Sequence, residues 1–133
     1  MFIERLLNQG NAPLLEQVLK FSAARHKLIA ENMANVDTVG YRQKDLSTAK
    51  FYALLGDRVK ARGESAPGEV GFDDIGVDVD HPTAGILFHD GNNRSMEQLT
   101  AEQAKNGMLY TMAIELLKKQ YGQMEMALKE RVG

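Results

Sequence analysis

The chain lacks cysteine altogether, which excludes disulfide bonds, thiolate metal sites and a cysteine nucleophile. No apolar run approaches the roughly 18 residues that a membrane-spanning helix needs. The formal net charge is only -2, and lysine and arginine are scattered among acidic residues. The clustered basic face of a nucleic-acid-binding protein is therefore missing. With 133 residues, of which 44% are hydrophobic and 26% charged, the composition fits one ordinary folded domain.

Catalytic motifs are also absent, because the sequence contains no G-x-S-x-G, no H-E-x-x-H and no Walker A loop. One group of potential metal ligands lacks the glycine and the terminal glutamate of an EF-hand. Its members are Asp78, Asp80, His81, His89 and Asp90. We prefer a polar hairpin with a turn at this place, and a metal-dependent hydrolase is the competing hypothesis. The sequence thus predicts no enzyme, no metal and no cofactor.

A helical period runs from Leu14 to Asn35, where apolar residues recur at spacings of three and four. At about 1.5 Å per residue, this helix would be roughly 33 Å long. His26 lies within the apolar stripe, and no second potential ligand stands at helical spacing from it. We therefore expect a packed or bridging histidine rather than a metal ligand.

A second, longer helical period follows Asn92 and Asn93 and extends to Arg131. Ser95 and Gln98 can form a capping box at its start, although Asn92 or Asn93 can cap the helix instead. The period keeps a heptad seam over four repeats, which comprises Leu99, Gln103, Asn106, Tyr110, Ala113, Leu117, Gln120, Met124 and Ala127. About 54 Å of helix is implied. Since one small domain cannot bury so long a stripe, we expect it to need the first helix and other subunits.

Polar residues interrupt this seam at Gln103, Asn106 and Gln120, and such residues can fix register and partner at some cost in stability. Gly107 and Gly122 each weaken the helix by about 1 kcal/mol relative to alanine. Two interpretations stay open for these glycines: they permit the close approach of another helix, or the packed helix merely tolerates them.

The middle of the chain has weaker signals. Leu46 to Val59 can hold another turn or two of helix, which Gly56-Asp57 interrupts. We expect a mobile loop over 60–76, because glycine recurs there among few apolar residues. Val77 to Asp80 alternates as a short strand does, and Ile86 to Phe88 would be its partner in a small hairpin.

These patterns predict a mainly α fold in which two long terminal helices pack as an antiparallel, coiled-coil-like pair. Residues 1–41 and 93–133 would form a discontinuous helical core. Residues 42–92 would form a small, irregular middle segment with a loop and some β structure.

The stretch that ends the first helix has the composition of a built helix exit. Gly40 allows a positive φ without steric penalty, and Asn35 can accept a left-handed backbone angle and bond local backbone groups. Tyr41 offers a large face that can pack back on the helix end. The residues suited to this role are Asn32, Asn35, Asp37, Thr38, Gly40 and Tyr41. On turn chemistry alone, this would be an ordinary helix–turn.

The full string Ala34-Asn35-x-Asp37-Thr38-x-Gly40-Tyr41 is more specific, because it resembles the N-terminal signature of rod and hook proteins of the bacterial flagellum. A proline usually precedes the glycine of that signature. Val39 takes its place here, so the turn loses a preset φ. The Asp90-Gly91-Asn92-Asn93 segment before the last helix and the short chain resemble a proximal rod subunit. The resemblance covers both ends of the chain and not the middle.

The resemblance implies a structural role without a reaction, a small-molecule substrate or a nucleic-acid partner. Subunits would leave unfolded through the flagellar type III export channel and then pack helically to transmit torque. The implied partners are other flagellar rod subunits, a rod-base adaptor protein, the MS ring and the export gate. The implied location is the periplasm-spanning rod of the basal body.

The N-terminus does not read as a secretory signal, because Glu4 and Arg5 interrupt its apolar stretch and no small-residue cleavage site follows. We therefore expect export without a cleaved signal peptide. We expect assembly to depend on Asn32, Asn35, Asp37, Thr38, Gly40, Tyr41, Asn92, Asn93, Gln103, Asn106, Tyr110, Leu117 and Met124. Without the resemblance, the competing hypothesis is a helical adaptor or chaperone-like protein that binds amphipathic helices.

Overall fold

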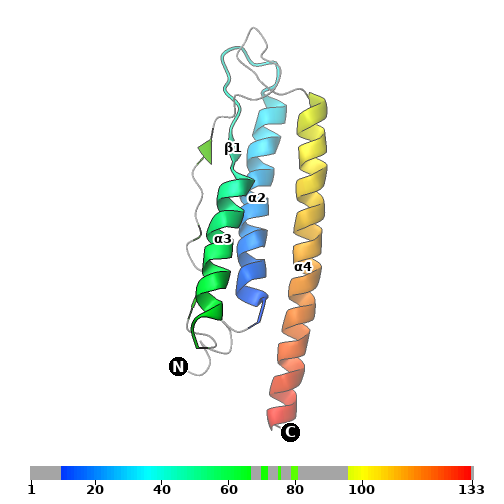
Figure 1. Ribbon diagram of the computed structural model, residues 1–133. Helices are drawn as coiled ribbons and strands as arrows, with labels where there is room; N and C mark the ends of the chain where they lie inside the picture. Colours follow the sequence, from blue (N-terminus) through cyan, green and yellow to red (C-terminus); the bar gives the residue numbers. More distant parts are fainter. Residues whose placement is uncertain (1–9, 67–69, 72–74, 76–78, 81–95, 133) are drawn as a thin grey trace.

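The structure is a computed structural model that describes residues 10–66, 70–71, 75, 79–80 and 96–132. Its described elements are three helices and two short strands (Figure 1). In chain order they are α2 (Ala12–Ala34), β1 (Asp45–Leu46), α3 (Thr48–Gly63), β2 (Val79–Asp80) and α4 (Met96–Val132). None of these helices is long and apolar enough to cross a membrane.

The helices α2 and α4 run antiparallel and side by side, while α3 lies along α2 on its other flank (Figure 1). The predicted mainly α fold with a terminal helix pair is therefore confirmed. The predicted boundaries of α2 are correct to within two residues. Pro13 fits the first turn of α2, where a missing N–H leaves no hydrogen bond unmade.

The core lies where the three helices and β1 meet, around α2. Phe21 of α2 stacks on Phe51 of α3, with ring centroids 4.1 Å apart. Both rings are buried, and burying each one stabilises the fold by about 1.5–3 kcal/mol. The buried cluster comprises Ala12, Leu15, Val18, Phe21, Leu46, Phe51, Leu55, Ala113 and Leu117.

The prediction for the middle segment was wrong about α3, which is a helix of 16 residues rather than a turn or two. Ser47 caps its start by accepting a hydrogen bond from the Lys50 N–H at 3.2 Å. The helix continues through Gly56, and a methyl group built there would meet nothing within 4 Å, so packing does not require glycine at this position. Its cost of about 1 kcal/mol is smaller than the gain from burying Phe51 and Leu55. The first residues of the predicted loop, up to Gly63, therefore belong to α3.

The strand prediction is confirmed at Val79–Asp80, and β2 pairs with β1, a partner that the sequence pattern did not indicate. The pairing is antiparallel and aligns Asp45 with Asp80 and Leu46 with Val79. The expected partner at 86–88 lies outside the described residues.

The two long helices differ in length. The helix α4 has 37 residues and α2 has 23. At about 1.5 Å per residue, α4 is therefore about 20 Å longer than α2. The C-terminal end of α4 therefore projects beyond the first residue of α2 (Figure 1).

Candidate assembly surface

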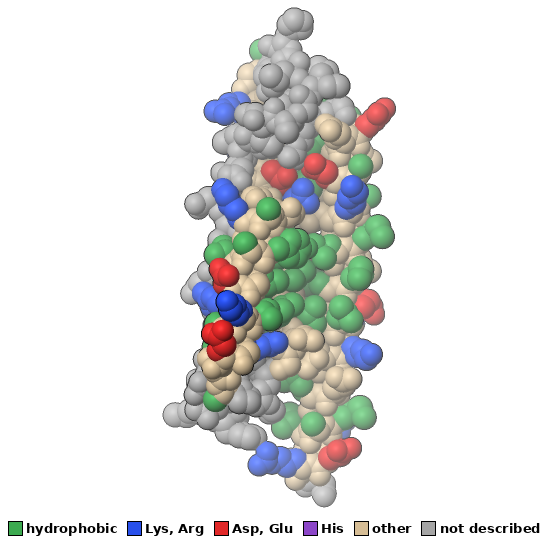
Figure 2. Space-filling view, in the orientation of Figure 1, with side chains coloured by type: hydrophobic (Ala, Val, Ile, Leu, Met, Phe, Trp, Pro, Cys, Tyr) green, Lys and Arg blue, Asp and Glu red, His purple; other side chains and the backbone are tan. Residues whose placement is uncertain are grey.

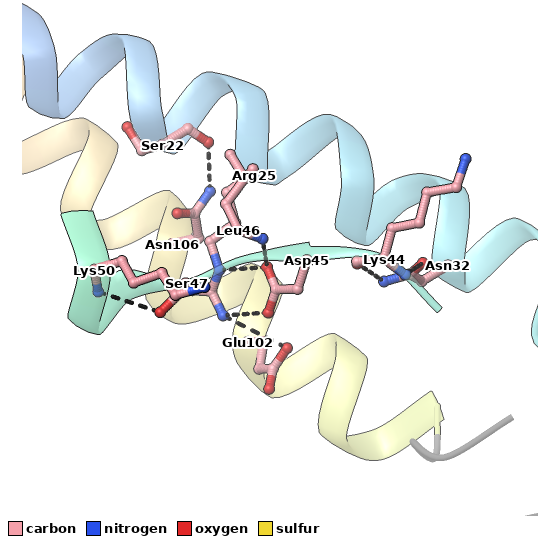
Figure 3. A network of polar contacts seen from close by, with 10 residues as sticks. All are labelled: Ser22, Arg25, Asn32, Lys44, Asp45, Leu46, Ser47, Lys50, Glu102 and Asn106. Carbon is pink, nitrogen blue, oxygen red and sulfur yellow. Dashed lines mark hydrogen bonds and ion pairs between the residues drawn. The ribbon is translucent and has the colours of Figure 1, made fainter. Parts of the chain in front are cut away.

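The exit of α2 is organised by Asn32, whose side chain is fully buried. Its amide makes two hydrogen bonds to the backbone of Lys44: Nδ2 donates to the carbonyl oxygen at 2.6 Å, and Oδ1 accepts from the N–H at 3.0 Å (Figure 3). The Tyr41 hydroxyl donates to the same Oδ1 at 3.1 Å. The Asn32 side chain thus bonds both backbone polar groups of Lys44, as the backbone of a neighbouring β-strand would.

The reversal itself takes place between Asn35 and Tyr41. The Thr38 N–H donates to the Asn35 carbonyl at 3.0 Å, and the Tyr41 N–H donates to the Thr38 carbonyl at 3.2 Å. Gly40 has a φ of 78°, as predicted, and the expected return of Tyr41 to the helix end is confirmed by its bond to Asn32.

Asn35 does not use the left-handed backbone angle that its residue type can accept, since its φ is -110°. The chain turns later, at Gly40, so Asn35 needs no unusual backbone angle. Its side chain bonds the local backbone as expected, since Nδ2 donates to the Glu31 carbonyl at 2.8 Å. The Thr38 hydroxyl donates to Asn35 Oδ1 at 3.2 Å. Asp37 is exposed.

Arg25 of α2 links β1, which follows the turn, to both long helices (Figure 3). Arg25 Nε and Nη2 donate to the two carboxylate oxygens of Asp45 at 2.9 and 3.2 Å. Arg25 Nη2 also lies 3.7 Å from a carboxylate oxygen of Glu102 on α4. Burial alone lowers the pKa of Arg25, but the hydrogen bond and charge of Asp45, with the charge of Glu102, outweigh it and raise that pKa. Three elements therefore share one ion-pair network.

Sequence reasoning missed this clamp. The available signal was Arg25 itself, since a charge three residues after Ser22 and four before Ile29 stands on the buried side of the helix. Its partners Asp45 and Glu102 follow 20 and 77 residues later. The sequence pattern around each of them does not indicate an ion pair with Arg25.

The predicted seam of α4 faces α2 over most of its length. Asn106 Nδ2 donates to the Ser22 carbonyl at 2.7 Å, and Gln103 Nε2 lies 3.3 Å from His26 Nε2. His26 thus bridges the two helices, which is one of the two roles expected for it, a packed or a bridging histidine. Leu117 lies in the core and Met124 packs against it.

Tyr110, another predicted assembly residue of α4, lies at the margin of this seam. Tyr110 is exposed, so it marks the edge of the helix pair. Asn92 and Asn93 lie outside the described residues.

The side of α4 that faces away from α2 carries large apolar residues in the open. Met108 and Met112 are 67% and 61% exposed, and Leu116 is exposed one turn further on. These three residues are spaced by four and form one stripe on the helix. We call Met108, Met112 and Leu116 the outer stripe.

A cavity of about 430 Å³ lies between α2 and α4 at the level of Asn106. Its lining residues are Ser22, Ala23, His26, Asn106, Gly107, Tyr110 and Thr111. Among the residues that the structure describes, no aspartate, glutamate, lysine or arginine lines it.

Within the described part of the chain, no group of three or more histidine, cysteine, aspartate or glutamate residues could hold a metal ion. Of the group weighed in the sequence, only Asp80 is described, and it belongs to β2.

Comparison with known proteins gives one informative similarity. No protein-family model matches the sequence. Among curated proteins, the flagellar basal body rod protein FlgB of Salmonella typhimurium is 26% identical over 118 residues, covering 79% of this chain and 83% of that protein. The resemblance to flagellar rod proteins is therefore confirmed: the chain is similar to the flagellar basal body rod protein FlgB over most of its length.

Proposed function

We propose that this chain is a structural subunit of the proximal rod of the bacterial flagellar basal body. It assembles helically with copies of itself and with other rod subunits, and it transmits torque from the motor towards hook and filament. The similarity to a protein named as a rod component supports this role. No reaction is needed for it.

The outer stripe is the observation that carries the proposal. Large exposed apolar patches are uncommon on soluble monomers and mark interaction sites. Met108, Met112 and Leu116 lie on one side of a helix whose other side is already occupied by α2. A long helix with two apolar sides needs a second neighbour, and other subunits supply it.

Torque transmission requires that the elements of one subunit move together. Arg25 joins α2, β1 and α4, and Asn32 joins the end of α2 to Lys44. Interiors packed in this way have low compressibility and transmit strain. These contacts support the mechanical part of the proposal.

The proposed partners are other rod subunits, a rod-base adaptor protein, the MS ring and the export gate. The proposed location is the rod, reached by export without a cleaved signal peptide. Among the residues expected to act in assembly, Asn32, Gly40 and Tyr41 act by fixing the exit of α2. Tyr110, at the edge of the helix pair, is placed to touch a neighbour.

Localisation in isolated basal bodies tests the proposal. An affinity tag on the chain should be found by immunogold labelling at the rod, between the membrane-embedded ring and the hook. Labelling elsewhere, or none in intact basal bodies, would contradict it. Sedimentation of the purified chain separates a rod subunit from an adaptor, because a rod subunit forms an open series of sizes and an adaptor closes at a fixed small number.

A further inference from the structure

The apolar side of α4 that faces α2 continues past the point where α2 begins. Leu117 and Ala12, the first residue of α2, belong to the same buried cluster. Further along this side, Met124 is half-buried and Leu128 is 44% exposed, whereas Leu117 is 9% exposed. Met124 and Leu128 are one turn apart and share one side of the helix. We call Met124, Ala127 and Leu128 the terminal strip, an apolar surface that α2 is too short to cover.

The chain that precedes α2 reaches α4 at Gly10. A Cβ built on Gly10 would collide with the Gln120 side chain, so the backbone passes close to α4 at this point. The Arg62 side chain of α3 donates a hydrogen bond to the Gly10 carbonyl, which helps to fix this position. Gly10 has a φ of 69°, so helical geometry stops there and the preceding chain need not follow the axis of α2. Residues 1–9, which lie outside the described residues, therefore join the fold directly beside α4.

The register of the helix pair indicates which residues of this segment face the terminal strip. In an antiparallel pair, each step back along one helix is matched by a step forward along the other. Counted from the close approach at Gly10, the fourth step brings Leu6 to the level of Met124. The eighth step brings Phe2 to the level of Leu128. Apolar side chains therefore meet at both levels, which is the arrangement that burial from water favours.

Residues 1–9 also have the length and the composition that the terminal strip requires. As a helix, such a segment spans about 13 Å, and Leu128 lies about 12 Å beyond Gln120 along α4. The apolar residues of the segment recur at helical spacing, and polar residues separate them. These apolar residues are Phe2, Ile3, Leu6 and Leu7. One side of the segment would thus cover the strip while the other side faces water.

We propose that the terminal strip is the docking site of the chain's own residues 1–9, which pack on it in the single subunit. A second copy would have to bring an apolar segment to the same place from solution. Residues 1–9 are instead tethered beside the strip through Gly10, which gives them a high effective concentration there. The inference concerns one chain and goes beyond the proposed function, so either can fail while the other stands.

Disulfide cross-linking tests this contact, because the chain contains no cysteine of its own. Mild oxidation of dilute Leu6→Cys/Met124→Cys should form a disulfide within one chain, since the bond requires Cβ atoms about 3.5–4.5 Å apart. The matched control is Leu6→Cys/Met126→Cys. Met126 is 63% exposed, and its side chain is turned by about 200° from that of Met124. The control disulfide should form at least about tenfold more slowly.

Amide hydrogen exchange followed by mass spectrometry gives a second readout on the otherwise unmodified chain. Phe2→Ser/Leu6→Ser should raise the exchange rate of α4 beyond Gln120 by about tenfold and leave the core of the helix pair unchanged. Glu4→Ser/Asn8→Ser is the matched control, because it makes the same change at the same spacing on the polar side of the segment. The control should alter neither region, and circular dichroism checks that every variant is folded.

Three outcomes would overturn the proposal. Disulfides that form equally fast at the two positions of α4, or at neither, would show that the segment does not dock on the terminal strip. Exchange that responds alike to both serine variants would show the same. Disulfides that join two chains in dilute solution would assign the strip to a second copy instead.

Discussion

The pair formed by α2 and α4 is held together differently in its two halves. Towards the start of α2, Leu15, Val18 and Phe21 share one apolar cluster with Ala113 and Leu117. Towards its end, the two helices meet through Ser22, Arg25, Glu102 and Asn106. Figure 2 shows this division on one face, where apolar side chains gather in the middle of the molecule and charged side chains lie above them.

Burial stabilises both halves, because Ile29 and Leu99 are fully buried towards the end of α2 as well, but the polar contacts that fix position are concentrated in that half. Apolar burial is non-directional. The apolar cluster near the start of α2 therefore contributes free energy of folding but tolerates small displacements of one helix along the other. Hydrogen bonds and ion pairs have fixed geometry, so Arg25 and Asn106 set the register of the helices and the place of β1. Asn106 contacts the Ser22 carbonyl across the helix pair, and its role in setting register stays a prediction.

The largest effect is expected from Phe51→Ala in the apolar half. Phe51 is fully buried and stacked on Phe21, so its truncation should lower the free energy of unfolding by about 3–5 kcal/mol. Urea denaturation followed by circular dichroism measures the change. Leu54→Ala on the exposed side of α3 is the control and should cost less than about 1 kcal/mol. Similar losses for the two variants would show that the core has been assigned to the wrong side of α3.

In the polar half, Arg25→Leu should cost about 2–3 kcal/mol, because it leaves the buried Asp45 carboxylate without its cation. The double variant Arg25→Leu/Asp45→Leu removes both charges and should recover part of that loss. Unfolding free energies of the wild type, both single variants and the double variant give the coupling directly. Strictly additive losses would mean that the clamp contributes nothing as a pair.

At the exit of α2, Gly40→Val should cost about 1–2 kcal/mol, because a β-branched residue is strained at a φ of 78°. Misplacing the exit should also reduce rod assembly, which motility and electron microscopy of basal bodies can measure. Gly56→Ala is the contrasting variant and should stabilise the chain by up to about 1 kcal/mol, since Gly56 is helical with open space around it. Normal basal bodies with Gly40→Val would contradict the role given to this turn.

The smallest effect concerns Tyr41 and alkaline pH. Desolvation by burial, and secondly the Glu31 carboxylate, raise the pKa of Tyr41 above its usual 10.0. A pKa that is higher in the folded chain contributes stability that is complete below the unfolded pKa and is lost as pH rises through the folded pKa. The free energy of unfolding should therefore fall above about pH 10. Tyr41→Phe should cost about 0.5–1 kcal/mol at neutral pH and show a weaker alkaline decline in pH-dependent denaturation. If the free energy of unfolding of Tyr41→Phe declines with rising pH as steeply as that of the wild type, the decline comes from other groups.

Local patterns predicted those features that local chemistry determines. The period of three and four residues is a property of a single helix, and it placed α2 and the seam of α4. Gly40 was predicted at a positive φ because that glycine stands in a turn string with Asn35 and Thr38. The same reasoning failed at Gly56, where the burial of Phe51 and Leu55 against α2 outweighs a weak local signal.

Features that depend on distant segments could not be predicted in this way. The pairing of β1 with β2 joins residues 33 to 35 positions apart, and the clamp joins Arg25 to Asp45 and Glu102. Nothing near Asp45 shows that it will be buried beside an arginine. The cavity likewise exists only once Ala23 and Gly107 face each other across the helix pair.

The unequal lengths of α2 and α4 also give the molecule a polarity. Among the described residues, the two helices lie together at one end and α4 alone projects at the other, so the two ends differ. Copies joined head to tail repeat a heterologous contact, which continues as an open filament unless its rotation closes a ring. A filament grown from such units has a defined direction, and its two tips offer different surfaces to whatever starts or stops its growth.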